Sequence, residues 1–518
     1  RGRSRLPAPP PRPRHLAPAR ARAPILVRGA GASRHPACDQ APLLRHNRLL
    51  DCLDVAEFVP EQIAETLPTA DSILEQMLDY AVVQQRIEDT VNERDLFDTR
   101  IMDCVMPRPS EVVRRFRADY ETSPELATQH YYALSIASNY IRKSRIDKNI
   151  AWKTSTEFGD LDVTINLSKP EKDPRDIAKA KLLKASSYPK CLLCRENEGY
   201  AGRSNHPARQ THRLIPLELG GHSWFLQYSP YTYYNEHCIV LNSEHVPMKI
   251  SRRTFENLAD FLDIFPHYFA GSNADLPIVG GSILSHDHYQ GGRYTFAMER
   301  AAVEKEYSFA GFPAVRAGRV KWPMSVLRLT SEDRGQLIAL AERILTAWRG
   351  YSDASVDILA ATDGVPHNTV TPIARRRGAA YEFDLVLRNN RTTEEHPLGL
   401  FHPHAEVHHI KKENIGLIEV LGLAILPARL KQEIAAVGVE LVKGTEDISS
   451  LPEIAKHADW YRMLRAKYNN LTEETVMPIL QQETGLVFRQ VLLHAGVFKR
   501  DAQGLTAFDA FVAAVSAR

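Results

Sequence analysis

The chain has 518 residues, of which 44% are hydrophobic and 25% charged, and its formal net charge is +2. This composition is that of a globular protein, and the sequence has no run of eighteen apolar residues, so no membrane span is expected. The first fifty residues carry eleven arginines and one acid, Asp39, which leaves a net charge of −8 on residues 51–518. A mildly acidic body gives no support for binding nucleic acid.

Residues 1–45 are rich in Arg, Pro and Ala and include nine prolines. Proline at this density blocks both helix and sheet. We therefore expect a disordered basic arm or, preferably, a misassigned start that is not part of the folded protein. A transit peptide is a further interpretation, but two serines and many prolines fit an amphipathic targeting helix poorly.

Residues 46–185 are predicted to form a mainly helical N-terminal region. Apolar residues recur at helical spacing at Ile73, Leu74, Met77, Leu78 and Ala81, and again at Val112, Val113, Phe116 and Tyr120. Residues 168–176 (SKPEKDPRD) are expected to be a linker or an exposed loop.

Residues 186–300 and 301–430 are predicted to be two α/β halves, and residues 431–518 a helical C-terminal region. Strands are predicted at Trp224–Tyr228, Cys238–Leu241, Val320–Leu327 and Tyr381–Leu387. Helices are predicted at Arg253–Phe265 and Ser331–Trp348. The mixture indicates an α+β or α/β fold.

The stretch from Asp275 to Gly292, DLPIVGGSILSHDHYQGG, joins an apolar run to three polar residues two positions apart. If the stretch is extended, His286, His288 and Gln290 point to one face, because side chains alternate along a strand. Nearby glycines let a ligand approach the backbone closely, and imidazoles serve as nucleophiles, acid–base groups or metal ligands. The pattern predicts a phosphate-handling site; a polar surface strand is the alternative.

A second histidine-rich stretch, FHPHAEVHHIKKEN, lies at 401–414. On a strand, one face would carry His402, His404, Glu406 and His408, with Lys411 and Lys412 following. Such a face can bind a divalent metal or line an anion site, and a polar face with satisfied hydrogen bonds is the alternative. The step of 116 residues from His286 to His402 suggests the same position in two copies of a diverged, duplicated domain.

Six cysteines are too few for a disulfide framework in a chain of this length and fit a reducing cytoplasm. Cys191 and Cys194 form a CxxC with metal-ligand spacing. A tetrahedral zinc site needs two further ligands. Candidates are His245 and His286, and the alternatives are His206, His212, His222 and His237.

The segment from Arg388 to Thr392, RNNRT, offers guanidinium and amide groups that suit phosphate or sugar hydroxyls. Arg388, Asn389 and Lys411 are therefore candidate substrate-binding residues; an Asn-Asn turn is the alternative for the first two. No Walker loop, GxGxxG, GxSxG or kinase signature occurs, which disfavours ATP-dependent kinases, nicotinamide enzymes and serine hydrolases. We predict no organic cofactor.

These stretches resemble those of the class II galactose-1-phosphate uridylyltransferases, the bacterial branch of that family. The resemblance extends from about Leu44 to the C-terminus. It rests on the stretch 275–292 and on HNRLLD, YYNEHCIVLNSEHVPM, TPIARRR, YEFDLVLRNNRT and HHIKKENIGLIEVLGLAILPARL. It implies a duplicated, histidine-triad-like mixed-sheet core between helical terminal regions. It also implies a cytoplasmic enzyme of galactose metabolism that acts on UDP-hexose and hexose 1-phosphate, and we add a homodimer as the expected assembly.

The resemblance further implies a double displacement in which UMP passes from UDP-glucose through a uridylyl-histidine to galactose 1-phosphate. The better-studied class I motif His-x-His-x-Gln would place the nucleophile at His288, a zinc ligand at His286 and a phosphate contact at Gln290. A glycine seven residues before the nucleophile would match Gly281. The other class I zinc ligands would fall on Cys191, Cys194 and His245. Class I has Pro between the histidines where this chain has Asp287.

Two other functions share parts of this pattern. A histidine-triad-type nucleotide hydrolase or dinucleoside-polyphosphate phosphorylase would use the same nucleophile, with water or phosphate in place of the sugar phosphate. A non-enzymatic zinc or nucleic-acid-binding protein would use the CxxC and the basic arm. The second is disfavoured, because the positive charge lies outside the predicted folded body.

Overall fold

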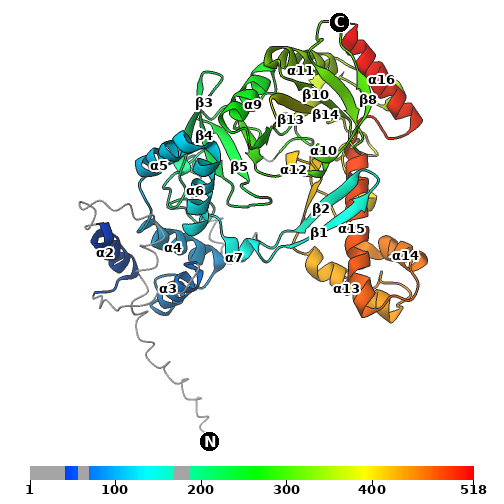
Figure 1. Cartoon of the computed structure of the whole chain (residues 1–518). Coiled ribbons are helices and arrows are strands. Elements are labelled where there is room, and N and C mark those ends of the chain that lie inside the picture. The colour runs from blue at the N-terminus through cyan, green and yellow to red at the C-terminus, as the bar shows by residue number, and fades with distance from the viewer. Residues whose placement is uncertain (1–40, 57–68, 169–185, 282, 518) are drawn as a thin grey trace, which may run out of the picture.

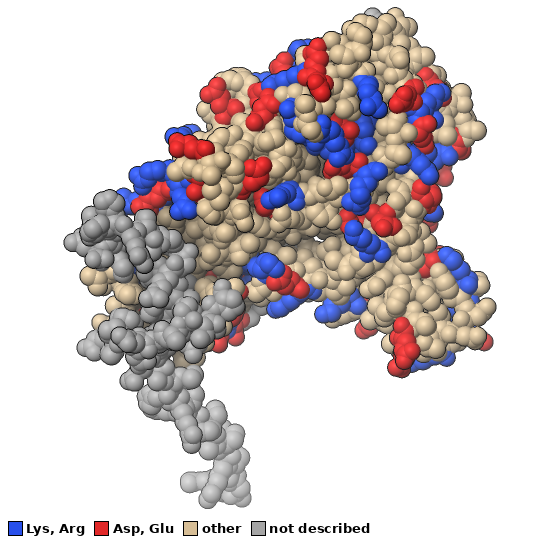
Figure 2. Space-filling model, viewed as in Figure 1, with Lys and Arg blue, Asp and Glu red and all other residues tan. Residues whose placement is uncertain are grey.

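The computed structural model describes residues 41–56, 69–168, 186–281 and 283–517. The predictions for most of 1–45 and of 168–176 lie outside these ranges. Within the described ranges, no helix has both the length and the apolar character needed to cross a bilayer. On the face that Figure 2 shows, basic and acidic side chains alternate over the described residues, so this face presents no broad basic surface for a nucleic-acid backbone.

The N-terminal region is helical, as predicted, and lies on one side of the molecule (Figure 1). Its helices are α2 (Ala41–Leu53), α3 (Asp71–Val83), α4 (Val91–Asp103), α5 (Pro109–Thr122), α6 (Pro124–Ala137) and the short α7 (Lys143–Ile146). The apolar stripe of α3 is buried against α2 and α4 in a small separate core. Pro109 stands in the first turn of α5, where its missing N–H is tolerated. Helix α2 includes residues 41–45, which were predicted to belong to the Arg/Pro-rich segment.

The centre of the molecule is a ten-stranded antiparallel sheet in the order β3-β4-β5-β7-β6-β13-β14-β10-β9-β8. Its strands are β3 (Ile215–Leu219), β4 (His222–Tyr228), β5 (Cys238–Asn242), β6 (Phe269–Gly271), β7 (His288–Gly292), β8 (Val303–Tyr307), β9 (Arg316–Val320), β10 (Val326–Ser331), β13 (Asn368–Arg377) and β14 (Ala380–Asn389). Because these neighbours pair antiparallel, the fold class is α+β.

The sheet is built twice over. From one edge inward the order is β3, β4, β5, β7, β6, and from the other edge it is β8, β9, β10, β14, β13. Each half has one helix at the same point, α9 (Arg252–Ile264) between β5 and β6 and α11 (Arg334–Arg349) between β10 and β13. The halves meet where β6 pairs with β13, at Gly271–Ile373 and Ala270–Ala374. The predicted duplication is therefore present in the topology.

The two faces of the sheet differ in what covers them. Helices α9 and α11 pack on one face (Figure 1), where Tyr289 and Phe383 belong to the largest apolar core. Residues paired across neighbouring strands point to the same face. The register Gln290–Gly271–Ile373–Asp384–Arg328 therefore runs along the opposite face, through both halves.

The C-terminal region is helical, as predicted; its long helix α15 packs on a second, small sheet, and its last helix α16 packs on α11. Its helices are α13 (Leu430–Lys443), α14 (Ala458–Lys467), α15 (Glu473–Ala495) and α16 (Ala502–Ser516). The small sheet has the order β1-β2-β15, from β1 (Ile150–Thr156), β2 (Gly159–Ile165) and β15 (Leu423–Leu426). Figure 1 shows the β1–β2 hairpin beside α15, more than 300 residues later, and Trp152 Nε1 donates to the carbonyl of Gln481 at 2.9 Å.

The remaining elements of the described residues are short. They are η2 (Arg195–Asn197), α10 (Ala297–Arg300), η3 (Ala354–Val356), β11 (Ala361–Thr362), β12 (Val365–Pro366), η4 (Ala405–Val407), α12 (Leu417–Val420) and η5 (Ala455–His457).

One predicted strand is wrong. The run Val320–Leu327 spans the turn between β9 and β10, because Trp322 and Met324 of that turn are buried for packing and not as parts of a strand. The condition that the stretch 275–292 is extended holds only for its end, because residues 276–281 and 283–284 contain no strand and β7 begins at His288. Hydrophobic character alone made the run 320–327 resemble a strand.

Candidate active site

Two thiols and two imidazoles come together beside the start of β7. The cluster consists of Cys191, Cys194, His245 and His286, whose ligand atoms all lie within 4.8 Å of one another. The Sγ atoms of Cys191 and Cys194 are 3.5 Å apart. His286 Nδ1 lies 3.3 Å from Cys191 Sγ, and His245 Nδ1 lies 3.1 Å from Cys194 Sγ. The other predicted ligand candidates are not members of this cluster.

The donor set fits a tetrahedral zinc ion. Zn–S and Zn–N bonds of about 2.3 and 2.0 Å put neighbouring ligand atoms roughly 3.5 Å apart, close to the separations seen here. His286 Nε2 lies 2.9 Å from the carbonyl oxygen of Asn242, which can only accept. Nε2 therefore carries the proton and Nδ1 turns its lone pair toward the thiols, as a metal-ligating histidine requires. Burial raises the pKa of Cys194 to about 11, so a bound cation is what would make this thiol a thiolate.

His288, the first residue of β7, has its ring held in one tautomer. Its Nδ1 lies 2.8 Å from the carbonyl oxygen of His286, so Nδ1–H donates and Nε2 keeps its lone pair. Nε2 makes no hydrogen bond within the described residues. The side chain is 6% exposed, and burial lowers the pKa of His288 to about 4, which keeps the ring neutral near pH 7. A neutral imidazole with one free nitrogen is a nucleophile.

Gln290 lies on the same sheet face as His288, two residues further along β7. Its Oε1 is 3.1 Å from Nε2 of His237, a contact that sequence reasoning missed because His237 was considered only as a zinc ligand. His237 belongs to the NEHC segment just before β5, and β5 pairs with β7. Only the pairing of β5 with β7 could have indicated the contact between His237 and Gln290, and the sequence alone did not reveal which strands pair.

Gly281 lies in the loop before β7, where a side chain has no room. A Cβ added there would be 2.4 Å from Nδ2 of Asn273. Asn273 in turn accepts from the backbone N–H of Leu417 at 2.8 Å. In the same loop Ile278 has a φ of 71°, which is rare for a β-branched residue and indicates a conformation imposed by its surroundings.

Arg388 of β14 is a buried cation on the face that carries Gln290. Its Nη2 donates to the carbonyl of Ile415 at 2.8 Å and its Nη1 to Thr371 at 3.3 Å, while its buried Nε has no partner. Burial lowers the pKa of Arg388 to about 10, so it stays charged near pH 7. The residues after Ile415 lead to Leu417, which packs over Gly271, the cross-strand partner of Gln290.

The two other predicted substrate-binding residues have their polar atoms engaged. Lys411 Nζ lies 3.1 Å from Glu419 Oε1 and 3.5 Å from Glu413 Oε2. Asn389 donates to the carbonyl of Leu359 at 3.0 Å and to Asn368 Oδ1 at 2.7 Å.

The prediction for 401–414 is wrong about structure. This stretch contains the 3-10 helix η4 and no strand, so its four polar side chains do not share a strand face. His402 is not the counterpart of His286, because the strand that corresponds to β7 in the second half is β14. A different group forms instead, in which His404, Glu406 and His494 bring their ligand atoms within 4.8 Å of one another.

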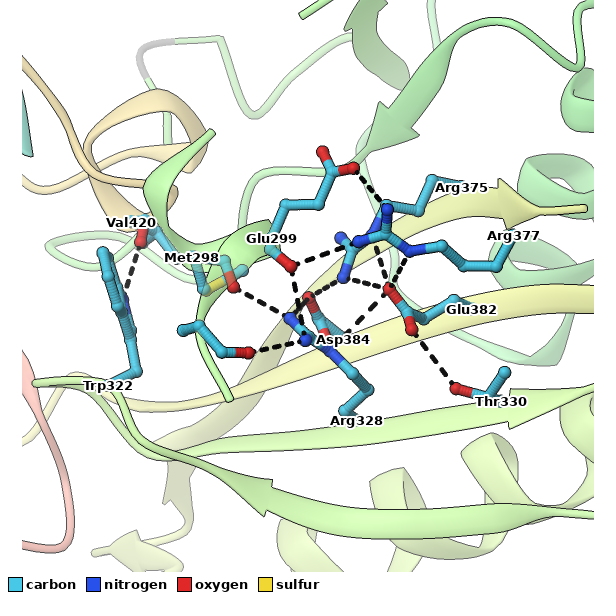
Figure 3. Close-up of polar contacts among 11 residues, drawn as sticks. Met298, Glu299, Trp322, Arg328, Thr330, Arg375, Arg377, Glu382, Asp384 and Val420 are labelled. Atoms are coloured by element: carbon cyan, nitrogen blue, oxygen red, sulfur yellow. Dashed lines mark hydrogen bonds and ion pairs between the residues drawn. The ribbon is translucent and has the colours of Figure 1, made fainter. Parts of the chain in front are cut away.

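In the second half, the sheet face that carries His288 and Gln290 in the first half is filled by ion pairs (Figure 3). Arg328 holds Asp384 through two bonds of 2.7 and 2.9 Å. Arg375 contacts Asp384 at 2.5 Å and Glu382 at 2.7 Å. Burial alone would raise the pKa of Asp384, but the two guanidinium groups outweigh it and hold that pKa below its usual value. This face of β14 therefore carries a charge-compensated ion-pair cluster, where β7 carries His288 and Gln290.

Comparison with known proteins identifies the family. Residues 38–247 match the model of the galactose-1-phosphate uridyl transferase N-terminal domain, and residues 260–461 match that of the C-terminal domain.

The chain belongs to the galactose-1-phosphate uridylyltransferase family.

Named family members align over nearly their whole length. A galactose-1-phosphate uridylyltransferase of Clostridium acetobutylicum is 66% identical over 466 residues, covering 90% of this chain and 94% of its own length. One of Halalkalibacterium halodurans is 54% identical over 475 residues, covering 91% and 94%. Among solved structures, yeast Ap4A phosphorylase Apa2 gives a TM-score of 0.32 at 13% identity, covering 61% of this chain and 92% of its own.

Proposed function

We propose that the protein exchanges UMP between UDP-glucose and galactose 1-phosphate, giving glucose 1-phosphate and UDP-galactose, through a uridylyl-histidine intermediate. The observation that carries the proposal is the single free nitrogen of His288, whose other nitrogen is tied to the carbonyl of His286. The names of the relatives that align over most of the chain support the choice of substrates.

In the first half-reaction, Nε2 of His288 attacks the α-phosphorus of UDP-glucose. A P–N bond forms, the P–O bond to the β-phosphate breaks, and glucose 1-phosphate leaves. The adduct ring is then an imidazolium, whose remaining N–H still donates to the His286 carbonyl at 2.8 Å. That hydrogen bond stabilises the positive charge without removing the proton, which keeps the ring a good leaving group.

In the second half-reaction, a phosphate oxygen of galactose 1-phosphate attacks the same phosphorus. The P–N bond breaks, UDP-galactose leaves, and His288 returns to its neutral tautomer with the proton still on Nδ1. Burial of His288 limits access of water, which would otherwise hydrolyse the adduct.

The neighbouring side chains take supporting roles in this proposal. Gln290 contacts the uridylyl phosphate, and Arg388 supplies positive charge to the diphosphate. Gly281 allows the loop before β7 to pack closely at the nucleotide. Asn389 and Lys411 stay predictions as substrate contacts, since both are engaged by neighbouring groups.

We also propose that Cys191, Cys194, His245 and His286 hold a zinc ion. Bound there, the ion would fix the ring of His286 and with it the backbone carbonyl that orients His288. The reduced thiols of the cluster agree with a cytoplasmic location, which we propose for the enzyme.

Incubation with UDP-glucose alone tests the proposal. We expect one uridylyl group per chain by intact mass, located on His288 by peptide mapping and removed by galactose 1-phosphate. His288→Asn should lose exchange by about 10⁴-fold or more, whereas His222→Asn, at an exposed position of β4, should not. Normal exchange by His288→Asn would contradict the mechanism. Release of nucleoside monophosphate without any sugar acceptor would favour a hydrolase or phosphorylase.

A further inference from the structure

His237 contacts the amide of Gln290, and the proposed chemistry does not yet use it. It lies in the connection that leads into β5 and is 2% exposed. The rings of Tyr233 and Tyr234 flank it, with centroids at 5.6 and 4.5 Å. Within the described residues its two ring nitrogens have one polar partner each. Nδ1 lies 3.0 Å from the carbonyl oxygen of Tyr231, and Nε2 lies 3.1 Å from Gln290.

The first of these partners determines where the proton of the ring lies. A carbonyl oxygen can only accept, so Nδ1 carries the hydrogen and donates it to Tyr231. Burial also lowers the pKa of His237 to about 4, which keeps the ring neutral near pH 7. Nε2 then has only a lone pair, and it can only accept.

The second partner must therefore donate. The amide atom nearest to Nε2 is Oε1, which can only accept. The two ends of a carboxamide have nearly the same shape, so the hydrogen-bond network decides which end faces the ring. With the –NH₂ group of Gln290 turned toward His237, one N–H donates to Nε2. The second N–H remains free for another acceptor.

We propose that His237 is a positioning residue, which holds the Gln290 carboxamide so that its free N–H donates to a phosphoryl oxygen of the uridylyl group. Without an acceptor at Nε2, the amide is free to turn by 180° and to present its carbonyl oxygen to the phosphoryl oxygen, where two acceptors repel. The inference rests on the proposed uridylyl transfer and specifies which end of Gln290 meets the phosphate.

A matched pair of variants separates this role from simple packing. His237→Asn keeps a short amide that can donate to Tyr231 but does not reach the position of Nε2. His237→Gln is one methylene longer and can place an amide oxygen there. We expect H237N to slow single-turnover uridylylation by UDP-glucose about tenfold or more, by analogy with the loss of one transition-state donor. The loss should appear in kcat, with little change in KM, and H237Q should be closer to wild type than to H237N.

A double-mutant cycle with Gln290→Ala completes the test. If His237 acts through Gln290, H237N/Q290A should be no slower than Q290A alone. Wild-type rates in H237N, or losses that multiply in the double variant, would overturn the proposal. If circular dichroism shows H237N to be unfolded, His237→Phe replaces it, because it also lacks an acceptor. A wild-type protein that forms no uridylyl adduct would refute the proposed function, whereas an adduct formed equally by wild type and H237N refutes only the role of His237.

Discussion

Replacing Asp384 by Asn should destabilise the fold strongly, because it removes the negative charge at the centre of the ion pairs in Figure 3. The Asp384 side chain is fully buried, and Arg328 and Arg375 are 7% and 4% exposed. The carboxylate receives two hydrogen bonds from Arg328 and one from Arg375. Glu382 would remain as a nearby acid, 2.6 Å from Arg375 and 3.8 Å from Arg328, but among the residues drawn in Figure 3 it would be the one carboxylate left in ion pairs with both guanidinium groups.

The expected loss of stability follows from the two guanidinium groups that stay buried after the carboxylate is removed. Each charge-assisted hydrogen bond contributes about 1.5–3 kcal/mol, and breaking a buried ion pair by removing one partner costs about 3–5 kcal/mol. An asparagine can keep part of the hydrogen bonding but none of the charge. We therefore expect a loss of about 3–5 kcal/mol in the free energy of unfolding, measured by urea denaturation with circular dichroism and tryptophan fluorescence.

The matched control is Asp147→Asn. Asp147 pairs with Lys143 on the surface, where the two side chains are 55% and 51% exposed. An exposed pair of this kind contributes at most about 1 kcal/mol. If Asp384→Asn costs no more than Asp147→Asn, the buried cluster gives no net stabilisation, and the argument from burial is wrong.

Further outcomes follow from other parts of the structure. The pKa of Asp384 is depressed in the folded state. Its contribution to stability is therefore present above its unfolded pKa of about 3.9 and is lost as the pH falls through the folded value. The urea midpoint of wild type should drop more steeply below about pH 4 than that of Asp384→Asn. Cys191→Ser should lower the zinc content per chain, measured by elemental analysis, and the melting temperature should fall with it; unchanged metal content would exclude the proposed ligand set. Gly281→Ala should cost about 1–3 kcal/mol and slow uridylylation, because its Cβ would clash with Asn273, and normal values of both would show that the loop relaxes freely. Arg388→Gln should weaken binding of UDP-glucose in calorimetry, and unchanged affinity would place the diphosphate elsewhere.

Much of the site could be predicted from the sequence because its residues follow regular spacing. Of the three residues predicted to share a strand face, His288 and Gln290 do so on β7, whereas His286 lies in the bend before the strand. The CxxC and the two histidines of its cluster carry donor types that zinc prefers, and the family resemblance connected them. The ligand types of the side chains and the two-residue alternation along a strand were enough to predict these residues.

What could not be predicted depends on tertiary contact. His237 reaches Gln290 only because β5 pairs with β7, a contact across 53 residues. The run at 320–327 is apolar because its turn residues Trp322 and Met324 pack into the core, so hydrophobic character alone did not distinguish this turn from a strand. The histidines at 401–414 have the spacing of a strand, but the backbone there forms a 3-10 turn.

The junction between β6 and β13 has the form of a contact between two separate proteins. Like edges that pair across an approximate two-fold make the interface that two copies of a half-size chain would form as a symmetric dimer. In a fused chain, only one of the two corresponding strands, β7 or β14, needs to carry the proposed nucleophile. On β14, Asp384 and its partners Arg328 and Arg375 occupy the corresponding sheet face. In the proposed mechanism, the first half of the sheet therefore carries the chemistry and the second half supports it through a buried ion-pair cluster.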